Sequence, residues 1–458
     1  MNKKNESTQL TLARQLAQHH ARLTYAGIPA ESSKAMKRLL LDYLGVAIAG
    51  SQTDSGSIAR EFARLQGKAQ EVTLIGGGGR VSMVAGAFAN AISCHSIELD
   101  DIDVLALFHF SPPVFSAALA VAEATAASGK DLLTAVASGC EVMERVSMAS
   151  NNDLRNRAFH TTPTCGVFGA TVAAAKLFKL KPDAMTSALG LAGAQASGLM
   201  EMYGPSMQKR FNPGPAARNG VTAAMMAKLG FTGADTIFEG ERGFLRAFAG
   251  GKMGGELVRK LGAPYELLIE FKPYSCARPI HNAIDCALEI RREHAPKLND
   301  IQAIVVRRHP DWSEYHRNDA PRTYHEAQVS LPYSVAIAFL EGKALLEQYS
   351  NRKLKLPAVR RLMDITKIET DASLPRGVSC HMTVTLSGGE RYTAQVDYPK
   401  GSIQNPMTDD ELQTKFEALA VPVVGRARAS RIVDTVMEVD RCRNIGELMK
   451  LTASARRA

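Results

Sequence analysis

The sequence predicts a mainly α protein: a large all-α helical domain formed by both chain ends, with a smaller α+β domain inserted between them. From about residue 8 to 266 the chain is rich in Ala, Leu and Met at helical spacing. Between 267 and 405 it changes to short β-branched runs and a hairpin pattern, and from 406 the helical pattern returns. We therefore expect the helical domain to comprise 1–266 and 406–458, and the α+β domain to comprise 267–405.

The helices expected in the first part share one spacing of apolar residues. At 32–44, two serines of the kind that cap helices precede apolar residues with a period near 3.6. The same spacing recurs at 115–127, 131–148, 166–178 and 216–229. The stretch 166–177 is small and apolar nearly all round, which is typical of a helix inside a bundle.

The inserted part reads as a sheet with helices on one face. Residues 301–308 are short and β-branched, and 379–386 alternate, turn at Gly388-Gly389 and return over 391–396 as a hairpin. The helices expected to cover the sheet are 279–293, 331–341 and 356–365. A further capped helix is expected to begin near Thr408.

Composition excludes several classes of protein. Of 458 residues, 45% are hydrophobic and 22% charged, as in globular proteins with a substantial core. A net charge of +9 favours anionic partners, but only 6% of residues are aromatic and the basic residues are dispersed, so no nucleic-acid surface is predicted. No apolar run is long enough for a membrane span and no signal peptide is visible, so we expect a cytoplasmic protein.

The cysteines do not predict a cofactor. There are seven, an odd number, and no two stand at C-x-x-C spacing. A disulfide framework, a zinc ribbon and an all-cysteine iron–sulfur site are therefore poorly supported. We expect no metal and no cofactor.

Two histidines stand where catalytic histidines could be. His109 follows an acidic stretch in which Glu98 and Asp101 would share a face if the stretch were helical. A lone histidine in apolar surroundings is more often a hydrogen-bonded core residue, but a carboxylate can fix the tautomer of an imidazole, so the neighbouring acids strengthen the case for a catalytic role of His109. His160 precedes the small-residue helix, whose N-terminus favours an anion.

Cations and a tyrosine follow at later positions. Lys209 and Arg210 lie in a Pro/Gly-rich loop before a helix, although such a pair is usually surface. Lys272, Arg278 and His281 come from one short segment. Tyr333 lies in Ser330-Leu331-Pro332-Tyr333-Ser334, and no one of these motifs is decisive alone.

Together, the motifs resemble the MmgE/PrpD family over about residues 35–445. The order that carries the resemblance is His95-x-x-Glu98-Leu99-Asp100-Asp101, His109-x-Ser111, Phe159-His160-x-Thr162, Lys209-Arg210-Phe211 with Gly214 and Ala216-Ala217, the segment Lys272 to His281, and Ser330 to Ser334. The family includes 2-methylcitrate dehydratase, cis-aconitate decarboxylase and an iminodisuccinate epimerase. The resemblance implies a metal-independent homodimer with a helical domain, a smaller α+β lid, and an active site in the cleft between them.

The resemblance also implies roles for particular residues. His109, His160, Lys209, Tyr333 and Asp101 match catalytic positions. Substrate binding is expected from the remaining candidates: Glu98, Arg210, Arg278, His281 and Lys272.

Three departures concern loops that would face the substrate. Glu98 stands where Asp is usual, Phe110 where Pro commonly follows the first histidine, and Asn212 where a histidine is common. These differences put the particular substrate in doubt more than the type of chemistry.

The leading hypothesis is a cofactor-independent lyase, of the dehydratase type, for a small di- or tricarboxylate. Cations would bind carboxylates, and histidines would move protons near neutral pH. Lys209 could act as a base if burial or a neighbour such as Arg210 lowered its pKa. The alternatives are an epimerase at an acidic α-carbon, with Lys209 and Tyr333 as bases on opposite faces, a cis-aconitate-type decarboxylase, and, less favoured, a non-enzymatic anion binder.

Overall fold

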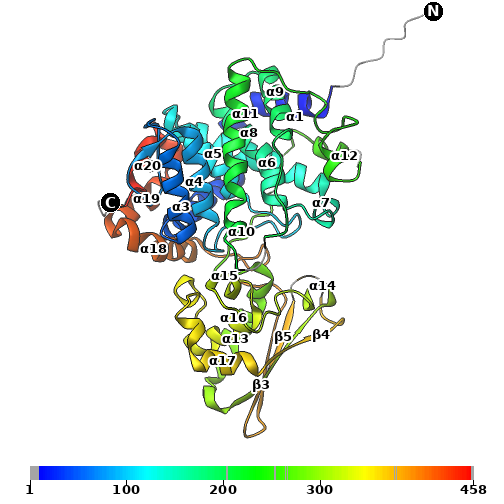
Figure 1. Cartoon of the computed structure of the whole chain (residues 1–458), viewed down its shortest axis with the longest axis vertical. Helices are drawn as coiled ribbons and strands as arrows, with labels where there is room; N and C mark the ends of the chain where they lie inside the picture. The colour runs from blue at the N-terminus through cyan, green and yellow to red at the C-terminus, as the bar shows by residue number, and fades with distance from the viewer. Residues whose placement is uncertain are drawn as a thin grey trace, which may run out of the picture.

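The computed structural model describes residues 10–202, 205–251, 254–263, 265, 267–375, 377 and 379–454. It is mainly helical, with an upper helical part and a lower part that contains a sheet (Figure 1). Two hydrophobic cores correspond to these parts. One joins buried residues from Ala13 to Phe271 with those from Met407 to Leu451, and the other extends from Cys276 to Ala394. Both chain ends thus contribute to one core, while the exact boundaries at 266 and 405 stay an interpretation.

The helical part is an arrangement of apolar helices around α8, Thr161–Leu177. Every residue of α8 except Lys176 is buried, as the small-residue pattern predicted. The other helices from the N-terminal stretch are α1 (Leu12–Arg22), α2 (Ala30–Gly50), α3 (Asp54–Leu65), α4 (Met83–His95), α5 (Ser111–Ala124), α6 (Gly129–Ser150), α7 (Asp153–Asn156), α9 (Pro182–Gly193), α10 (Gln208–Phe211), α11 (Pro213–Lys228) and α12 (Phe244–Phe248). A small antiparallel pair, β1 (Val72–Thr73) and β2 (Arg80–Val81), precedes α4.

Close packing in this part depends on glycine where helices cross. Gly139 on α6 and Gly169 on α8 face each other, and a Cβ on either would lie under 2.8 Å from the other's carbonyl oxygen. Such an approach is open only to a residue without a side chain. The sequence predicted the buried helix, and the structure explains its glycines.

The C-terminal helices return to the N-terminal ones. They are α18 (Asp409–Val424), α19 (Arg426–Met437) and α20 (Ile445–Leu451), and α18 packs on α2 (Figure 1). Thr408 caps α18 in a capping box with Glu411, which confirms the predicted helix start.

The inserted part, called the lid from here on, is a four-stranded sheet covered by helices. The strands are β3 (Ile301–Arg308), β4 (Thr366–Thr370), β5 (Cys380–Leu386) and β6 (Arg391–Val396), in the order β4-β3-β5-β6. The β3–β4 pair is parallel and the other pairs are antiparallel. The lid helices are α13 (His281–His294), α14 (Pro310–Ser313), α15 (Tyr324–Ala327), α16 (Leu331–Glu341) and α17 (Pro357–Asp364), of which α13, α16 and α17 lie on one side of the sheet (Figure 1).

No helix among the described residues is long and apolar enough to cross a membrane.

Candidate active site

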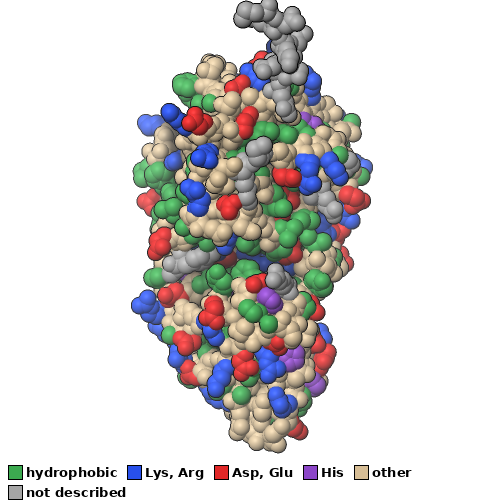
Figure 2. Space-filling view, turned by 90° about the vertical axis from the view of Figure 1, so that its right-hand side faces the viewer, with side chains coloured by type: hydrophobic (Ala, Val, Ile, Leu, Met, Phe, Trp, Pro, Cys, Tyr) green, Lys and Arg blue, Asp and Glu red, His purple; other side chains and the backbone are tan. Residues whose placement is uncertain are grey.

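A cavity of about 670 Å³ lies where the helical part meets the lid. Figure 2 shows the molecule narrowing at the junction of the two parts. The helical part lines the cavity with Glu98, His109, His160 and Lys209, among others. Lys272 and Arg278 come from the junction, and Asp311, Trp312 and residues 315–318 come from the lid. Six of the ten predicted site residues therefore share one cavity.

The acidic stretch that leads into the cavity is not a helix. Helix α4 ends at His95, residues 96–101 are turns or irregular, and Glu98 has a φ of 56°. The expectation that Glu98 and Asp101 share a helix face is therefore wrong, because a left-handed residue interrupts helical spacing. Instead, their carboxylates bind different helices.

Asp101 holds the start of α5 rather than lining the cavity. Its carboxylate accepts the backbone N–H groups of Phe110 at 2.7 Å and Ser111 at 3.1 Å, and the Ser111 hydroxyl. The first amides of a helix have no intrahelical acceptor, so this carboxylate caps α5. Burial and the adjacent Asp100 raise the pKa of Asp101 to about 7.

His109 and His95 share one carboxylate. Asp100 Oδ2 lies 2.7 Å from His95 Nδ1 and 3.2 Å from His109 Nδ1, and the two imidazole rings are 4.9 Å apart. His109 Nδ1 also contacts the Asp101 carbonyl. Because a carbonyl can only accept, Nδ1 of His109 carries the proton and Nε2 is the free acceptor.

The protonation state of His109 suits a base. Burial lowers its pKa to about 3, even though Asp100 acts in the opposite direction. At neutral pH the ring is therefore uncharged, with a bare nitrogen, on a side chain that lines the cavity. A pKa this low makes the imidazole a weak base, and a carboxylate bound in the cavity would raise the pKa toward the range in which a histidine takes a proton efficiently.

His160 has the complementary tautomer. It occupies the N-cap position of α8, and Asn212 Nδ2 donates to its Nδ1 at 3.0 Å. Its Nε2 must then carry the proton. Burial, followed by His95 and His109, holds the pKa of His160 well below the ordinary value, so it is a neutral hydrogen-bond donor.

Glu98 lies at the centre of a buried cationic cluster. Its Oε1 accepts from Lys209 and Arg210, and Lys272 Nζ lies 3.4 Å from Oε2. All four side chains are nearly inaccessible; Lys209 is the most exposed, at 12%. Burial alone would raise the pKa of Glu98, but the three cations lower it by more. The net pKa lies well below the ordinary value, so the carboxylate stays ionised.

The cluster has more positive than negative charge. Three cations face one carboxylate, and the pKa of Lys209 is lowered by burial first, with Arg210 and Lys272 adding to the effect against Glu98. An anion entering the cavity would offset this excess in a low-dielectric setting. As the sequence suggested, Arg210 lowers the pKa of Lys209. Arg210 itself does not line the cavity, and its Nη2 donates to Gln328 Oε1 at 2.9 Å.

Arg278 supplies a further donor to the cavity. Its Nε pairs with Glu270 at 2.7 Å, and its Nη1 donates to His281 Nδ1 at 3.1 Å and to the Lys400 carbonyl at 3.2 Å. Its Nη2 is buried without a hydrogen-bond partner among the described residues. His281 is fully buried and is not among the residues that line the cavity; its contact with the cavity wall is the hydrogen bond that its Nδ1 accepts from Arg278.

Tyr333 lies outside the cavity. It is fully buried in the lid core, and its hydroxyl donates to the Gln348 carbonyl at 2.6 Å. The first turn of α16 directs this side chain inward, so the sequence motif marks a helix start with a core tyrosine. The pair of Lys209 and Tyr333 on opposite faces of a substrate is therefore not formed.

Four residues near the site were missed from the sequence. His95 and Asp100 are part of the quoted motif, and their spacing with His109 was the available signal. Arg155 and His316 also line the cavity, but their sequence surroundings carry no comparable pattern. Only the fold brings them to the site.

The fold also creates two groups with metal-ligand spacing that the sequence did not predict. Ligand atoms of His95, Asp100 and His109 all lie within 4.8 Å of one another, as do those of a second group, His19, His20 and Glu141. In the first group, both histidine Nδ1 atoms already lie within 3.2 Å of the Asp100 carboxylate.

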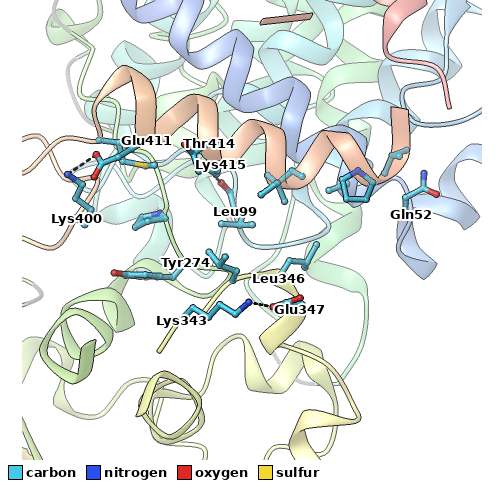
Figure 3. Close-up of a pocket in the computed structure, with 18 of the residues that line it drawn as sticks. Gln52, Leu99, Tyr274, Lys343, Leu346, Glu347, Lys400, Glu411, Thr414 and Lys415 are labelled. Carbon is cyan, nitrogen blue, oxygen red and sulfur yellow. Dashed lines mark hydrogen bonds and ion pairs between the residues drawn. The ribbon is translucent and has the colours of Figure 1, made fainter. Parts of the chain in front are cut away.

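A second cavity, of about 970 Å³, lies between α18 and the lid (Figure 3). Leu99 lines this cavity, whereas its neighbour Glu98 lines the first one. The ion pairs Lys400–Glu411 at 2.8 Å and Lys343–Glu347 lie at its rim, and much of its wall is the apolar face of α18. It contains none of the predicted site residues.

Known proteins match this chain along nearly its whole length. A cis-aconitate decarboxylase-like protein, oryM, of Aspergillus oryzae is 29% identical over 93% of both chains. The cis-aconitate decarboxylases of Aspergillus terreus and Homo sapiens are each 27% identical, over 93% and 90% of this chain and 92% and 89% of their own. Models of the MmgE/PrpD N-terminal and C-terminal domains match residues 14–255 and 274–439. The chain belongs to the MmgE/PrpD family.

Proposed function

We propose that this protein is a cofactor-independent lyase that removes CO₂ or water from a small di- or tricarboxylate. One observation carries the proposal: a single cavity combines excess buried positive charge with two neutral histidines of opposite tautomer. Cations of this kind bind carboxylates, and the histidines can accept and donate protons. The relatives, which act as carboxylate-processing enzymes by name, support the same class of substrate.

The chemistry common to both reactions develops charge beside a carboxylate. Loss of CO₂ or removal of an α-proton leaves an electron pair on carbon, which an adjacent carboxylate accepts as an enolate-type dianion. Lys209, Lys272 and Arg278 would stabilise that charge because they are fixed and desolvated before the reaction begins. The closing lid would exclude water from the intermediate.

Decarboxylation is the first reaction to test. The relatives that match this chain bear the name cis-aconitate decarboxylase, and the match extends over both parts of the fold. Such a reaction needs a proton donor for the carbon that loses CO₂, and a histidine can serve.

Dehydration is the second candidate, because His109 and His160 differ in tautomer. A bare Nε2 on His109 can remove an α-proton, while Nε2–H of His160 can assist the leaving hydroxyl. A decarboxylase needs only the donor. The paired acid and base therefore favour keeping the dehydratase hypothesis.

One experiment distinguishes these reactions. Protein dialysed against a strong chelator is incubated in D₂O with cis-aconitate, 2-methylcitrate and iminodisuccinate, and the products are followed by ¹H NMR. CO₂ loss, water loss, or exchange without net conversion identify decarboxylase, dehydratase and epimerase respectively. Turnover of none of these acids, or turnover that only one added metal restores, would contradict a cofactor-independent lyase.

A further inference from the structure

We propose that His316 is the proton-transfer residue contributed by the lid, acting on the face of the substrate opposite His109. This inference rests on the proposed function. Both residues line the same cavity, His109 from the helical part and His316 from the lid. The lid residue expected in this role, Tyr333, lies in the lid core.

The backbone of His316 is unusual for a residue with a side chain. Its φ is 65°, in the left-handed region that L residues rarely occupy. Such a conformation costs free energy and persists only where the surroundings impose it. Among the described residues of the cavity lining, Glu98 and Leu107 also have positive φ, so three such residues face one space.

A buried arginine imposes this conformation. Arg308, at the end of β3, is 1% exposed, and its Nη1 donates to the carbonyls of Trp312 at 2.8 Å and Tyr315 at 3.1 Å. Its Nη2 donates to the Pro279 carbonyl at 2.7 Å, which ties the segment to the start of α13. The peptide on the N-terminal side of His316 is therefore fixed.

The C-terminal side is fixed as well. The Leu331 N–H donates to the His316 carbonyl at 2.9 Å, and the Ser330 hydroxyl donates to the Asn318 carbonyl at 2.5 Å. Both donors belong to the start of α16, so the segment is held between β3 and α16. The ring is thus aimed by rigid elements rather than by a free loop.

The charges around His316 connect it to the opposite wall. Burial, then Arg308 and Lys209, lower the pKa of His316 to about 4, while the Val329 backbone and Glu98 raise it. Lys209 and Glu98 belong to the helical part, so charges on the opposite side of the cavity change the pKa of the His316 ring. At neutral pH the imidazole is uncharged and able to accept a proton.

The step can be written for both candidate reactions. In a dehydration of a substrate whose α-C–H bond faces the lid, that bond breaks and the proton goes to a ring nitrogen of His316, which takes the role that His109 has for the opposite face. The electron pair is delocalised into the adjacent carboxylate and then forms the C=C bond, while the hydroxyl leaves as water with the Nε2 proton of His160. In a decarboxylation, the C–C bond breaks, CO₂ leaves, and the remaining electron pair takes a proton from the His316 imidazolium. The proton of that imidazolium is taken up from the bulk solvent, and a bound anion favours this uptake because it offsets Lys209 and Arg308, which lower the pKa of His316.

The first test uses His316→Asn, because Asn tolerates a left-handed backbone better than most residues. We expect kcat to fall by roughly 10²–10⁴-fold with a small change in KM and in melting temperature. The control is His294→Gln, an exposed lid histidine that stacks on Tyr392 outside the cavity, which should behave as wild type. A His316→Asn enzyme with wild-type kcat overturns the inference while leaving the proposed function intact.

The second test needs no turnover. Histidine resonances are titrated by NMR with and without propane-1,2,3-tricarboxylate. The resonance absent from His316→Asn should titrate about one pH unit higher with the tricarboxylate, as expected for a nearby anion. An unchanged titration of that resonance overturns the inference. If no acid is turned over but this shift occurs, the proposed reaction fails and the placement of His316 against the anion stands.

Discussion

Lys209 illustrates how the surroundings determine what a residue does. In the sequence it is one of two adjacent cations, a pattern usually found on a surface. In the fold, its amine and the Arg210 guanidinium both reach Glu98, more than a hundred residues earlier in the chain. The sequence indicated a cation that could bind a carboxylate, but the burial of Lys209 and its pairing with Glu98 depend on tertiary packing.

Lys209→Met should abolish turnover and weaken carboxylate binding, because it removes a desolvated cation while keeping most of the apolar stem. Folding should persist, since Arg210 and Lys272 still neutralise Glu98. Calorimetric titration with propane-1,2,3-tricarboxylate and the melting temperature measure both effects. Lys343→Met, at the rim of the second cavity (Figure 3), is the matched control and should bind normally. Equal affinity in the two variants would remove Lys209 from the site.

His109→Gln should lower kcat by roughly 10²–10⁴-fold, because His95, the other histidine on Asp100, does not line the cavity and cannot replace it. The amide can still donate to the Asp101 carbonyl, so the melting temperature should change little. Steady-state kinetics beside thermal unfolding separate the two quantities. A large loss of melting temperature with kcat preserved in the folded fraction would indicate a core histidine instead.

At the scale of elements, local signals fixed most boundaries. The Ser330 cap and the left-handed Gly342 delimit α16 at the predicted residues 331–341, and β3 is found at the predicted 301–308. Strand β4 was missed because its short sequence, Thr366–Thr370, is mostly exposed at the edge of the sheet. The turn at Glu98 was missed because contacts distant in sequence, with Lys209, Arg210 and Lys272, hold that residue.

The start of α5 gives a pH-dependent prediction through Asp101. Its folded pKa of about 7 lies above the unfolded value near 3.9, so the native state binds more protons between these pH values. The contribution of Asp101 to the free energy of unfolding therefore falls as pH rises from 4 to 7. Asp101→Asn lacks this loss, so its stability relative to wild type should improve by up to about 1.4 kcal/mol per pH unit.

Urea unfolding of both proteins at pH 4.5, 5.5 and 6.5 measures that difference. Replacing one acceptor oxygen by the amide group adds an offset to the absolute stability of Asp101→Asn, and that offset does not depend on pH. A constant difference across the three pH values would mean that Asp101 is ionised throughout and has no raised pKa.

At the scale of the whole molecule, the two cores meet at a junction that supplies the site. The sequence predicted the change from helical spacing to short β-branched runs, and it predicted that site residues come from both sides of the junction. It could not indicate which lid residues enter the cavity, because Tyr333 and His316 lie within eighteen positions of each other. Only the packing of α16 and β3 turns Tyr333 into the lid core and His316 toward the cavity. Homodimer formation stays a prediction.

Buried neutral histidines should make the whole protein acid-sensitive. Burial lowers the pKa of His20, His109, His160 and His281 below the unfolded value near 6.5. Their contribution to stability is fully present above pH 6.5 and is lost as pH falls, because the unfolded chain then binds the extra protons. Four aspartates with raised pKa, Asp42, Asp101, Asp103 and Asp285, act in the opposite direction, but they are outnumbered because His19, His316 and His325 also have lowered pKa. The urea midpoint should be lower at pH 5 than at pH 7.5, and an equal or higher midpoint at pH 5 would contradict neutral burial of these rings.

The central claim is that the cavity between the helical part and the lid, not the larger one beside α18, takes the carboxylate. A crystal structure of the protein with propane-1,2,3-tricarboxylate tests it most directly. We predict carboxylate oxygens within hydrogen-bonding distance of Lys209 and Arg278, and the ligand carbons between His109 and His316. Ligand density confined to the cavity lined by α18, or a ligand without contact to Lys209 and Arg278, would contradict the account.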